Sequence, residues 1–239
     1  MENILISFDL LIINFLYEHP FLSFSQINLF ILDKDSHLKE RLGILCEYKY
    51  ISFLKTNNLS NIKYYYLLSK ALKVIKKKNL LRNSERNSLF LMHNIESNKF
   101  FINLKKVSLN HNLEFSDWIS DRMIFTKFNY NGHLYTLTPD GFCIFNKSNI
   151  YLELDRGTEG YMKIFKKIDL YSDFYLSFEY KKYFEEYPKV IFIFLDSKRA
   201  SLVSNRVSKY LDINKYKEEL DFFYFYSKED FFKNKINML

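Results

Sequence analysis

The stretch Tyr151-Leu-Glu-Leu-Asp-Arg-Gly-Thr-Glu159, preceded by Thr138-Pro-Asp-Gly141, decides the fold of the second half of the chain. It is typical of a strand that ends in two acids, Glu153 and Asp155, with Asp140 at the start of the preceding hairpin. Because residues two apart on a strand point to the same face, we expect both carboxylates to converge with Asp140. Clustered carboxylates repel one another unless a cation neutralises them, and Mg²⁺ prefers such oxygen ligands and activates water. The pattern favours a metal-dependent hydrolytic site, although acids at strand ends also serve as turn and capping residues.

Alternating and continuous apolar runs surround this stretch, and four of the five glycines fall between residues 132 and 160, where they mark tight turns. We predict helices over about 158–182, from 196 or 197 to 211, and after 226. The run 189–195 is nearly all apolar, as in a strand buried on both faces. A sheet with helices on both faces is the simplest architecture. The predicted strands are 123–129, 133–138, 142–146, 150–155, 189–195 and 222–226.

The first 78 residues have the element order of a winged helix. Three helices are predicted, over about 4–18, over 24–31 and from 35 or 36 onward, where apolar residues recur at helical spacing. Two β-rich runs, 50–54 and 62–68, follow around a polar turn, and Ser69 is placed to cap a basic helix. We predict a winged-helix domain over 1–82, a helical linker over 83–111 and a second domain over 112–239.

The acidic stretch also resembles known families. Pro139-Asp140 with Glu153 resembles the PD-(D/E)XK nuclease signature, and residues 153–159 with Lys167, Ile168 and Tyr171 resemble the replication-relaxation family. Weaker likenesses to that family extend over most of the chain: 24–29, 42–51 and 65–69 to its winged helix, His93 and Asn98 to its middle helix, Trp118, Asp121 and Arg122 to a Trp-plus-acid helix, and 194–199 to its strand-to-Arg turn. The resemblance implies an α+β protein, a winged helix followed by an α/β/α restriction-endonuclease-like domain. It also implies DNA association and a role in relaxing or controlling plasmid replication.

The resemblance further implies a set of site residues, with one departure. A PD-(D/E)XK site has Lys two residues after the Glu, where this chain has Asp155; in relatives the lysine can migrate to the following helix. There Lys163 and Lys166 fall on the solvated side of a helical wheel, whereas Lys167 lies at the flank of the buried face. The implied catalytic set is Asp140, Glu153, Asp155 and Lys167, and the implied Mg²⁺ ligands are Asp140, Glu153 and Asp121.

Several other residues have a structural and a functional interpretation. We expect Trp118 to be a core anchor and His93 a satisfied core histidine. Asp121 either joins the metal cluster or forms a salt bridge. Arg199 either reaches a phosphate or braces the sheet edge. Gly157 and Thr158 are expected to turn the chain and cap the following helix, whose N–H groups can hold an anion.

Positive charge favours a nucleic-acid partner. The chain carries a net charge of +7, although AT-rich coding inflates Lys. The third predicted helix would enter the major groove, with His37, Glu40, Ile44 and Glu47 outward and two cations at its margins, and its carboxylates would oppose phosphates. The stronger basic cluster follows it, and we expect it to clamp DNA phosphates, the alternative being a solvated face of a lysine-rich helix. The predicted nucleic-acid contacts are Lys39, Arg41, Lys55, Lys63, Lys70, Lys73, Lys77 and Arg199.

Other classes fit poorly. The two cysteines, Cys46 and Cys143, show no zinc or disulfide spacing. No secretory leader is evident, and no apolar run is long enough to cross a bilayer, so we expect a cytoplasmic protein without membrane contact. A replication or mobilisation partner and a homodimer are both compatible with the sequence.

Two functions stay open on sequence alone. The intact acids favour a DNA-binding protein of a plasmid, phage or other mobile element that cuts DNA with Mg²⁺. The missing Glu-x-Lys lysine favours a winged-helix regulator, or a protein-binding or inhibitor module, whose nuclease-like domain has lost turnover.

Overall fold

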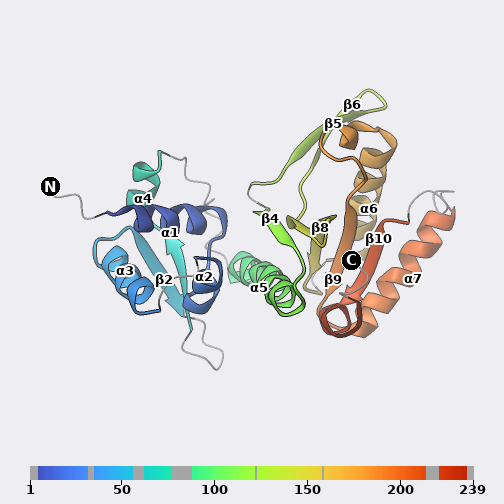
Figure 1. Ribbon diagram of the computed structural model, residues 1–239. Coiled ribbons are helices and arrows are strands. Elements are labelled where there is room, and N and C mark those ends of the chain that lie inside the picture. Colours follow the sequence, from blue (N-terminus) through green and yellow to red (C-terminus); the bar gives the residue numbers. More distant parts are fainter. Residues whose placement is uncertain are drawn as a thin grey trace. The chain divides into compact units, whose positions relative to one another are not determined.

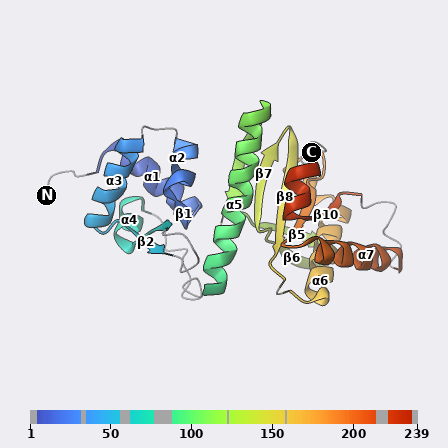
Figure 2. The ribbon, with the colours of Figure 1, turned by 90° about the horizontal axis from the view of Figure 1, so that it is seen from below.

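The computed structural model describes residues 5–31, 35–55, 62–76, 88–121, 123–157, 159–213 and 221–235. The chain divides into two compact units, Met1–Ile102 and Asn103–Leu239, both mixed in helix and strand (Figure 1). The division falls within α5, Ser88–His111, which is one continuous helix in Figure 2. Residues that we predicted to form a linker therefore contribute to both units.

The N-terminal unit combines helices with a small antiparallel sheet of order β1-β3-β2. The predicted helices and strands of this region are confirmed, and a two-residue strand, β1, is added to them. Strands β2 and β3 pair in register from Ile51↔Leu67 to Lys55↔Lys63. The elements are α1 (Ser7–Glu18), β1 (Leu22–Ser23), α2 (Phe24–Ile31), α3 (Asp35–Glu47), β2 (Ile51–Lys55), β3 (Lys63–Leu67) and α4 (Ser69–Val74).

Helix caps in this unit differ from the sequence prediction at one place. Leu68 is the N-cap of α4, and Ser69 is its first helical residue, so Ser69 does not cap the helix as predicted. Leu38, Leu42 and Leu45 of α3 are buried, as their helical spacing predicts.

The C-terminal unit is built on a five-stranded sheet of order β10-β9-β8-β7-β4, with β5 and β6 as a separate hairpin. Strands β4, β7 and β8 form an antiparallel meander, whereas β8, β9 and β10 run parallel and are joined through α6 and α7. The elements are β4 (Phe115–Ser120), β5 (Thr126–Tyr130), β6 (His133–Leu137), β7 (Gly141–Phe145), β8 (Ser148–Asp155), α6 (Tyr161–Leu176), η2 (Glu179–Lys182), β9 (Lys189–Phe194), α7 (Ser197–Ile213), β10 (Phe223–Ser227), α8 (Lys228–Asp230) and η3 (Phe231–Lys235).

The prediction of a helix around Trp118 was wrong. Residues Phe115–Ser120 form β4, an edge strand paired with β7 and interrupted by a register shift between Ser116 and Ile119. Aromatic and β-branched residues favour strands, and this run of Phe, Trp and Ile follows that preference. Trp118 is buried, as expected of a core anchor.

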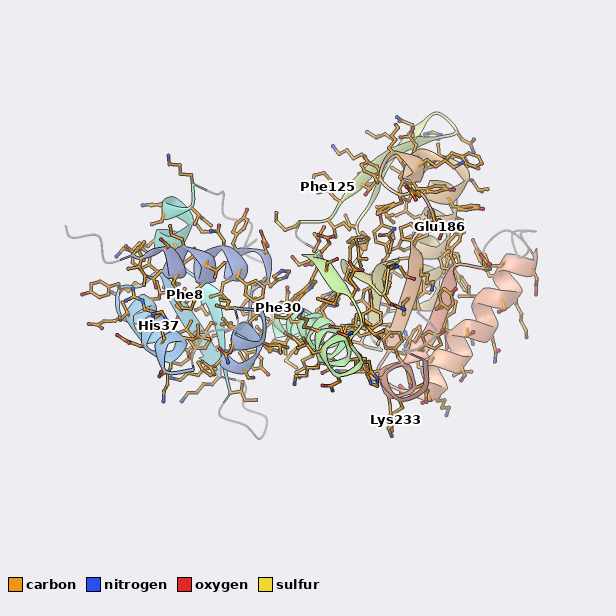
Figure 3. The ribbon with its side chains drawn as sticks, in the orientation of Figure 1. Phe8, Phe30, His37, Phe125, Glu186 and Lys233 are labelled. Carbon is orange, nitrogen blue, oxygen red and sulfur yellow. The ribbon has the colours of Figure 1, made fainter. Side chains whose placement is uncertain are left out.

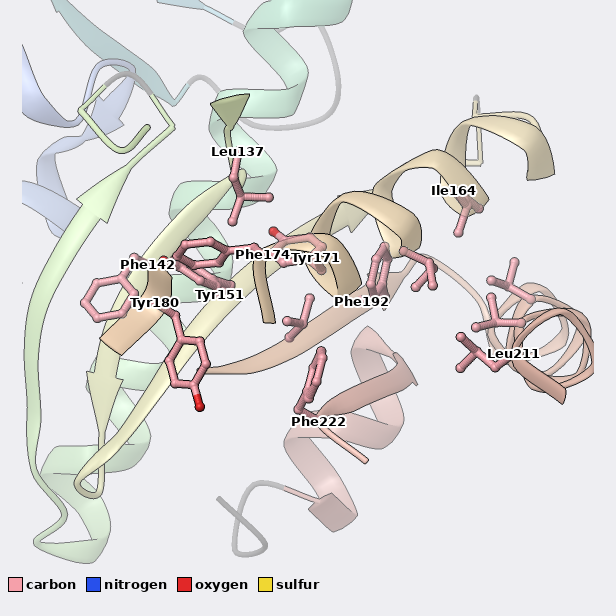
Figure 4. Close-up of a cluster of buried hydrophobic side chains, with 14 of the residues drawn as sticks. Leu137, Phe142, Tyr151, Ile164, Tyr171, Phe174, Tyr180, Phe192, Leu211 and Phe222 are labelled. Atoms are coloured by element: carbon pink, nitrogen blue, oxygen red, sulfur yellow. The ribbon is translucent and has the colours of Figure 1, made fainter. Parts of the chain in front are cut away.

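One face of the large sheet packs under α6 and α7, and the register of β8 and β9 shows which residues lie there. Val190, Phe192 and Phe194 of β9 share one apolar core with Ile164 and Ile168 of α6 and with α7 (Figure 4). Tyr151, Glu153 and Asp155 of β8 lie opposite these three β9 residues in register. The two acids therefore point into the layer between the sheet and the helices, and neither faces open solvent.

No helix in the part of the chain that the structure describes combines the length and hydropathy needed to cross a bilayer.

Candidate functional site

Glu153 is the most buried of the predicted acids, and both of its oxygens have partners on α6. The Tyr171 hydroxyl donates to Oε1 at 2.6 Å, and Lys167 Nζ donates to Oε2 at 2.7 Å. The Glu153 side chain is 3% exposed and that of Lys167 is 24% exposed. Lys167 and Tyr171 are four residues apart, so one face of the helix presents an ammonium and a hydroxyl to the same carboxylate. The structure thus brings Glu153 and Lys167 together.

Burial and neighbouring charges shift the pKa values of both residues of this pair. It raises the pKa of Glu153 to about 7, because Lys167 and the Tyr171 hydroxyl offset only part of the cost of desolvation and of the neighbouring Asp140 charge. Burial alone would lower the pKa of Lys167, yet Glu153, Asp140 and Glu159 together raise it above its ordinary value. Lys167 is therefore cationic at neutral pH, and it lies within the field of three carboxylates.

Asp155 is neutralised from α7. Arg199 Nε donates to Asp155 Oδ2 at 2.7 Å, and a second guanidinium nitrogen lies 2.5 Å from the same oxygen. The guanidinium also donates to the Glu159 carbonyl at 2.5 Å, and the Gly157 N–H donates to Asp155 Oδ1 at 2.6 Å. Arg199 is held in place by Asp196, whose carboxylate accepts from the Arg199 N–H and caps α7, as predicted. Arg199 thus ties α7 to the end of β8, and its contact with a phosphate stays a prediction.

Asp140 lies at the start of β7, beside Glu153. Its N–H donates to the Leu152 carbonyl at 2.9 Å, and its Oδ2 accepts from the Leu154 N–H at 2.7 Å. Asp140 therefore hydrogen-bonds to β8 on either side of Glu153, at Leu152 and Leu154. Its charge acts on both Glu153 and Lys167.

The resemblance predicted that Asp121 lies in a helix, and the structure does not place it in one. It lies in the turn after β4, where the Met123 and Ile124 N–H groups donate to the Ser120 carbonyl. Arg122 and Thr158 fall outside the described residues. Gly157 turns the chain with a φ of +81°, as expected, and the N-cap of α6 is Gly160.

The predicted three-residue set of Mg²⁺ ligands is not brought together in the part of the chain that the structure describes. Within the described ranges, no three His, Cys, Asp or Glu side chains come together as a metal site, so the predicted set Asp140, Glu153 and Asp121 does not assemble. Both Glu153 oxygens are engaged by α6, and Asp155 is engaged by Arg199 and the Gly157 N–H. Cationic side chains, those of Lys167 and Arg199, are thus the ion-pair partners of these two acids.

The Tyr171 hydrogen bond gives a direct stability prediction. Tyr171→Phe removes the hydroxyl that supports a buried carboxylate, and we expect a loss of about 1.5–3 kcal/mol in the free energy of unfolding. Trp118 is the single tryptophan and lies in this unit, so urea unfolding followed by its fluorescence reports the change. Tyr210→Phe is the matched control, because Tyr210 donates at 2.7 Å to the partly exposed Asp169 and should cost less. Equal losses in the two variants would contradict a special role for the Glu153 contact.

The N-terminal unit holds the predicted nucleic-acid contacts other than Arg199, and the structure separates those that it describes into two groups. Arg41 belongs to the fold. Its Nε donates to Asp9 Oδ1 at 2.8 Å, and its second contact, with Asp9 Oδ2, is a salt bridge. Asp9 is 0% exposed and also accepts from the Ile6 N–H at 2.9 Å. Arg41 is thus engaged in joining α3 to α1, which corrects its assignment as a DNA contact.

The exposed face of α3 is poorly suited to a polyanion. Lys39, Glu40, Gly43 and Glu47 are exposed, and the two carboxylates outnumber the lysine. His37 is half-buried and stacks on Phe8 of α1 with ring centroids 4.7 Å apart (Figure 3). Glu40 and Glu47 are exposed as predicted, whereas His37 and Ile44 of the predicted outward face are half-buried.

The exposed lysines of β2, β3 and α4 contrast with α3. Lys55 and Lys63 are exposed and directly opposite each other across the β2–β3 pair. Like charges in that position repel one another, so an anion between them would stabilise the pair. Lys63 Nζ lies 4.3 Å from the centroid of the Phe53 ring, which limits where the ammonium can go.

Two further exposed lysines lie on α4, which follows β3 at the end of the hairpin away from Lys55 and Lys63. Lys70 Nζ donates to the Tyr48 carbonyl at 2.9 Å and lies 4.2 Å from the Tyr50 ring centroid, so it is oriented by its surroundings. Lys73 is exposed on the same helix, and Lys77 lies outside the described residues.

Sequence reasoning missed the signal that distinguishes this surface most clearly. Residues 48–84 contain nine lysine and arginine residues and no aspartate or glutamate. No acid in that stretch is available to neutralise the lysines locally, so the basic surface keeps its positive potential. We call the exposed Lys55, Lys63, Lys70 and Lys73 the lysine surface.

Other residues singled out in the sequence are structural. Asn98 is buried on α5, and its side-chain amide donates to the Pro20 carbonyl at 2.8 Å. His93 is half-buried on the same helix.

The comparisons with known proteins add a family. No curated protein matches the chain. A crystal structure of protein VC1899 from Vibrio cholerae is similar over 96% of this chain and 50% of that one, with 13% identity and a TM-score of 0.38. The chain thus spans about half the length of that protein, and a similarity this low carries no argument. A family model described as replication-relaxation matches residues 13–190, which is most of the chain. The chain therefore belongs to the replication-relaxation family.

Proposed function

We propose that this protein binds DNA through its N-terminal unit and controls the replication of the mobile element that encodes it. Family membership associates the chain with the replication of plasmids and other mobile elements. The order α1-β1-α2-α3-β2-β3, with a three-stranded antiparallel sheet, supports a winged-helix assignment for this unit. The β2–β3 hairpin would be the wing.

The lysine surface is the observation that carries this proposal. When a winged helix binds DNA through its recognition helix, that helix enters the major groove. Here the corresponding helix, α3, exposes Glu40 and Glu47. Exposed lysines lie instead at the turn end of the β2–β3 hairpin, where Lys55 and Lys63 face each other, and on α4, which follows β3 at the other end. Lysines that contact phosphates position a protein on the duplex without reading its sequence. We therefore propose backbone binding through wing and α4, with α3 contributing little affinity.

The C-terminal unit is proposed to be a PD-(D/E)XK domain that has kept its framework without turnover. Its support is the meander β4-β7-β8 followed by α6 and the parallel strand β9, with Asp140 and Glu153 adjacent on β7 and β8. Ion pairs from Lys167 and Arg199 satisfy the acids. In this proposal the unit serves binding or assembly, and it performs no hydrolysis.

Binding of a labelled duplex, followed by fluorescence anisotropy in the presence of a chelator, tests the proposed function. We expect saturable binding that is independent of divalent ions and only weakly dependent on duplex sequence, because phosphate contacts carry no sequence information. Absence of binding at low salt, where phosphate contacts are strongest, would contradict the proposal.

Metal-dependent DNA cleavage is the second candidate function, and one observation favours it. Lys167 reaches Glu153 from α6, which is where a lysine that has migrated from the Glu-x-Lys position would come from. Mg²⁺ would then have to be held by Asp140 and Glu153, and Lys167 would have to leave its carboxylate. Incubation of supercoiled plasmid with Mg²⁺ or Mn²⁺ tests this candidate: we expect no nicking by the wild-type protein. Nicking that Asp140→Ala and Glu153→Ala each abolish would establish the nuclease instead.

A further inference from the structure

The acidic centre of the C-terminal unit has an ammonium where a metal site would have its ion. Lys167 Nζ lies 2.7 Å from Glu153 Oε2 and 3.3 Å from Glu159 Oε2. Asp140 adds a third carboxylate whose charge acts on the same ammonium. Two carboxylates, those of Glu153 and Glu159, thus lie within ion-pair distance of one ammonium, and proteins hold Mg²⁺ with as few as one or two carboxylates.

The remaining charges of the centre are also paired within the chain. Arg199 forms an ion pair with Asp155 and donates a hydrogen bond to the Glu159 carbonyl. Lys163 pairs with Glu159 Oε1 at 2.5 Å. The Tyr171 hydroxyl donates a hydrogen bond to the other oxygen of Glu153, Oε1. A lysine that assists hydrolysis must have its ammonium available to the scissile phosphate, whereas Lys167 has two carboxylate partners and a side chain only 24% exposed.

We infer that the acidic centre is a self-neutralised network in which Lys167 replaces a divalent cation, and that removal of Lys167 opens a binding site for a hard divalent cation. Without the ammonium, Glu153 would keep the Tyr171 hydrogen bond and lose its ion-pair partner, and Glu159 would keep its ion pair with Lys163. Oxygen ligands left in that state attract Mn²⁺ or Mg²⁺ strongly. This inference concerns the C-terminal unit and does not rest on DNA binding by the lysine surface.

The gain of a metal site is measured with Mn²⁺ as the probe, by isothermal titration calorimetry of the full chain. We expect no saturable binding to the wild-type protein at millimolar Mn²⁺, saturable binding to Lys167→Ala, and loss of that gain in Glu153→Gln/Lys167→Ala. Lys163→Ala is the matched control, because it removes a neighbouring lysine that contacts Glu159 without contacting Glu153. Saturable Mn²⁺ binding by the wild-type protein that Glu153→Gln abolishes would overturn the inference, as would a folded Lys167→Ala that binds none.

A stability measurement tests the same network if Lys167→Ala does not fold. Lys167→Met leaves a buried carboxylate without its cation, and we expect the Tm of the Trp118 fluorescence transition to fall by roughly 10 °C. Glu153→Gln/Lys167→Met removes both charges and should recover most of that fall. An open metal site would behave in the opposite way, since an available lysine contributes little to stability. An unchanged or higher Tm in Lys167→Met would therefore overturn the inference.

Discussion

Arg41→Ala is expected to destabilise the N-terminal unit by about 3–5 kcal/mol, the largest stability effect that we predict. The guanidinium is the cationic partner of Asp9, which is 0% exposed. Among the described residues, truncation would leave the buried Asp9 carboxylate with the Ile6 N–H as its hydrogen-bond donor, where α1 packs on α3. An uncompensated buried charge costs far more than the loss of an exposed ion pair.

The two units allow this effect to be located. Trp118 fluorescence follows the C-terminal unit, whereas far-ultraviolet circular dichroism follows both units. In urea, Arg41→Ala should shift the dichroism transition and leave the fluorescence transition in place. Lys39→Ala, an exposed lysine on the same helix, should change neither by more than about 0.5 kcal/mol. A loss below about 1 kcal/mol in Arg41→Ala would show that Asp9 is stabilised by other groups.

Neutralisation of the lysine surface is expected to produce the largest effect on binding. The triple variant Lys55→Gln, Lys63→Gln and Lys73→Gln should bind a DNA duplex about 10–100-fold more weakly than the wild-type protein, at roughly 0.5–1 kcal/mol for each phosphate contact. Lys70 is left intact because its ammonium also holds the Tyr48 carbonyl. The loss should be similar for unrelated duplex sequences, since phosphate contacts do not read bases.

A control matched in charge separates this surface from the overall net charge. Lys106, Lys127 and Lys147 are exposed lysines of the C-terminal unit, and changing all three to Gln lowers the net charge by the same amount. We expect that variant to keep its affinity within a factor of about three. Equal losses in the two triple variants would mean that binding follows net charge and not the lysine surface.

The elements of the N-terminal unit could be predicted from local patterns. Leu38, Leu42 and Leu45 recur at helical spacing, and the strand runs around 51–55 and 63–67 flank a polar turn. The role of Arg41 could not be predicted, because its partner Asp9 lies 32 residues away and contact across that separation depends on how α1 packs on α3. A charged residue on a helix margin has the same pattern whether it faces solvent or a buried acid.

In the C-terminal unit, too, local sequence patterns predict the elements, whereas contacts between distant residues depend on tertiary packing. The sheet strands around Glu153, the buried strand β9 and the flank position of Lys167 could all be predicted from periodicity. Strand β4 was missed because a resemblance to a helical motif was followed over the β-forming residues Phe115, Trp118 and Ile119. Convergence of acids on one face was expected, but their burial beneath α6 and α7 followed only from the register of β8 with β9. That burial is the reason for the ion pairs with Lys167 and Arg199.

The salt dependence of duplex binding by the wild-type protein tests the central claim, that the lysine surface binds the DNA backbone, most directly. Four phosphate contacts release counterions, so the logarithm of the binding constant should fall linearly with the logarithm of salt concentration, with a slope of about −3.6. The triple variant of Lys55, Lys63 and Lys73 should reduce that slope by about 3. A slope near zero, or a slope that the triple variant leaves unchanged, would contradict the account.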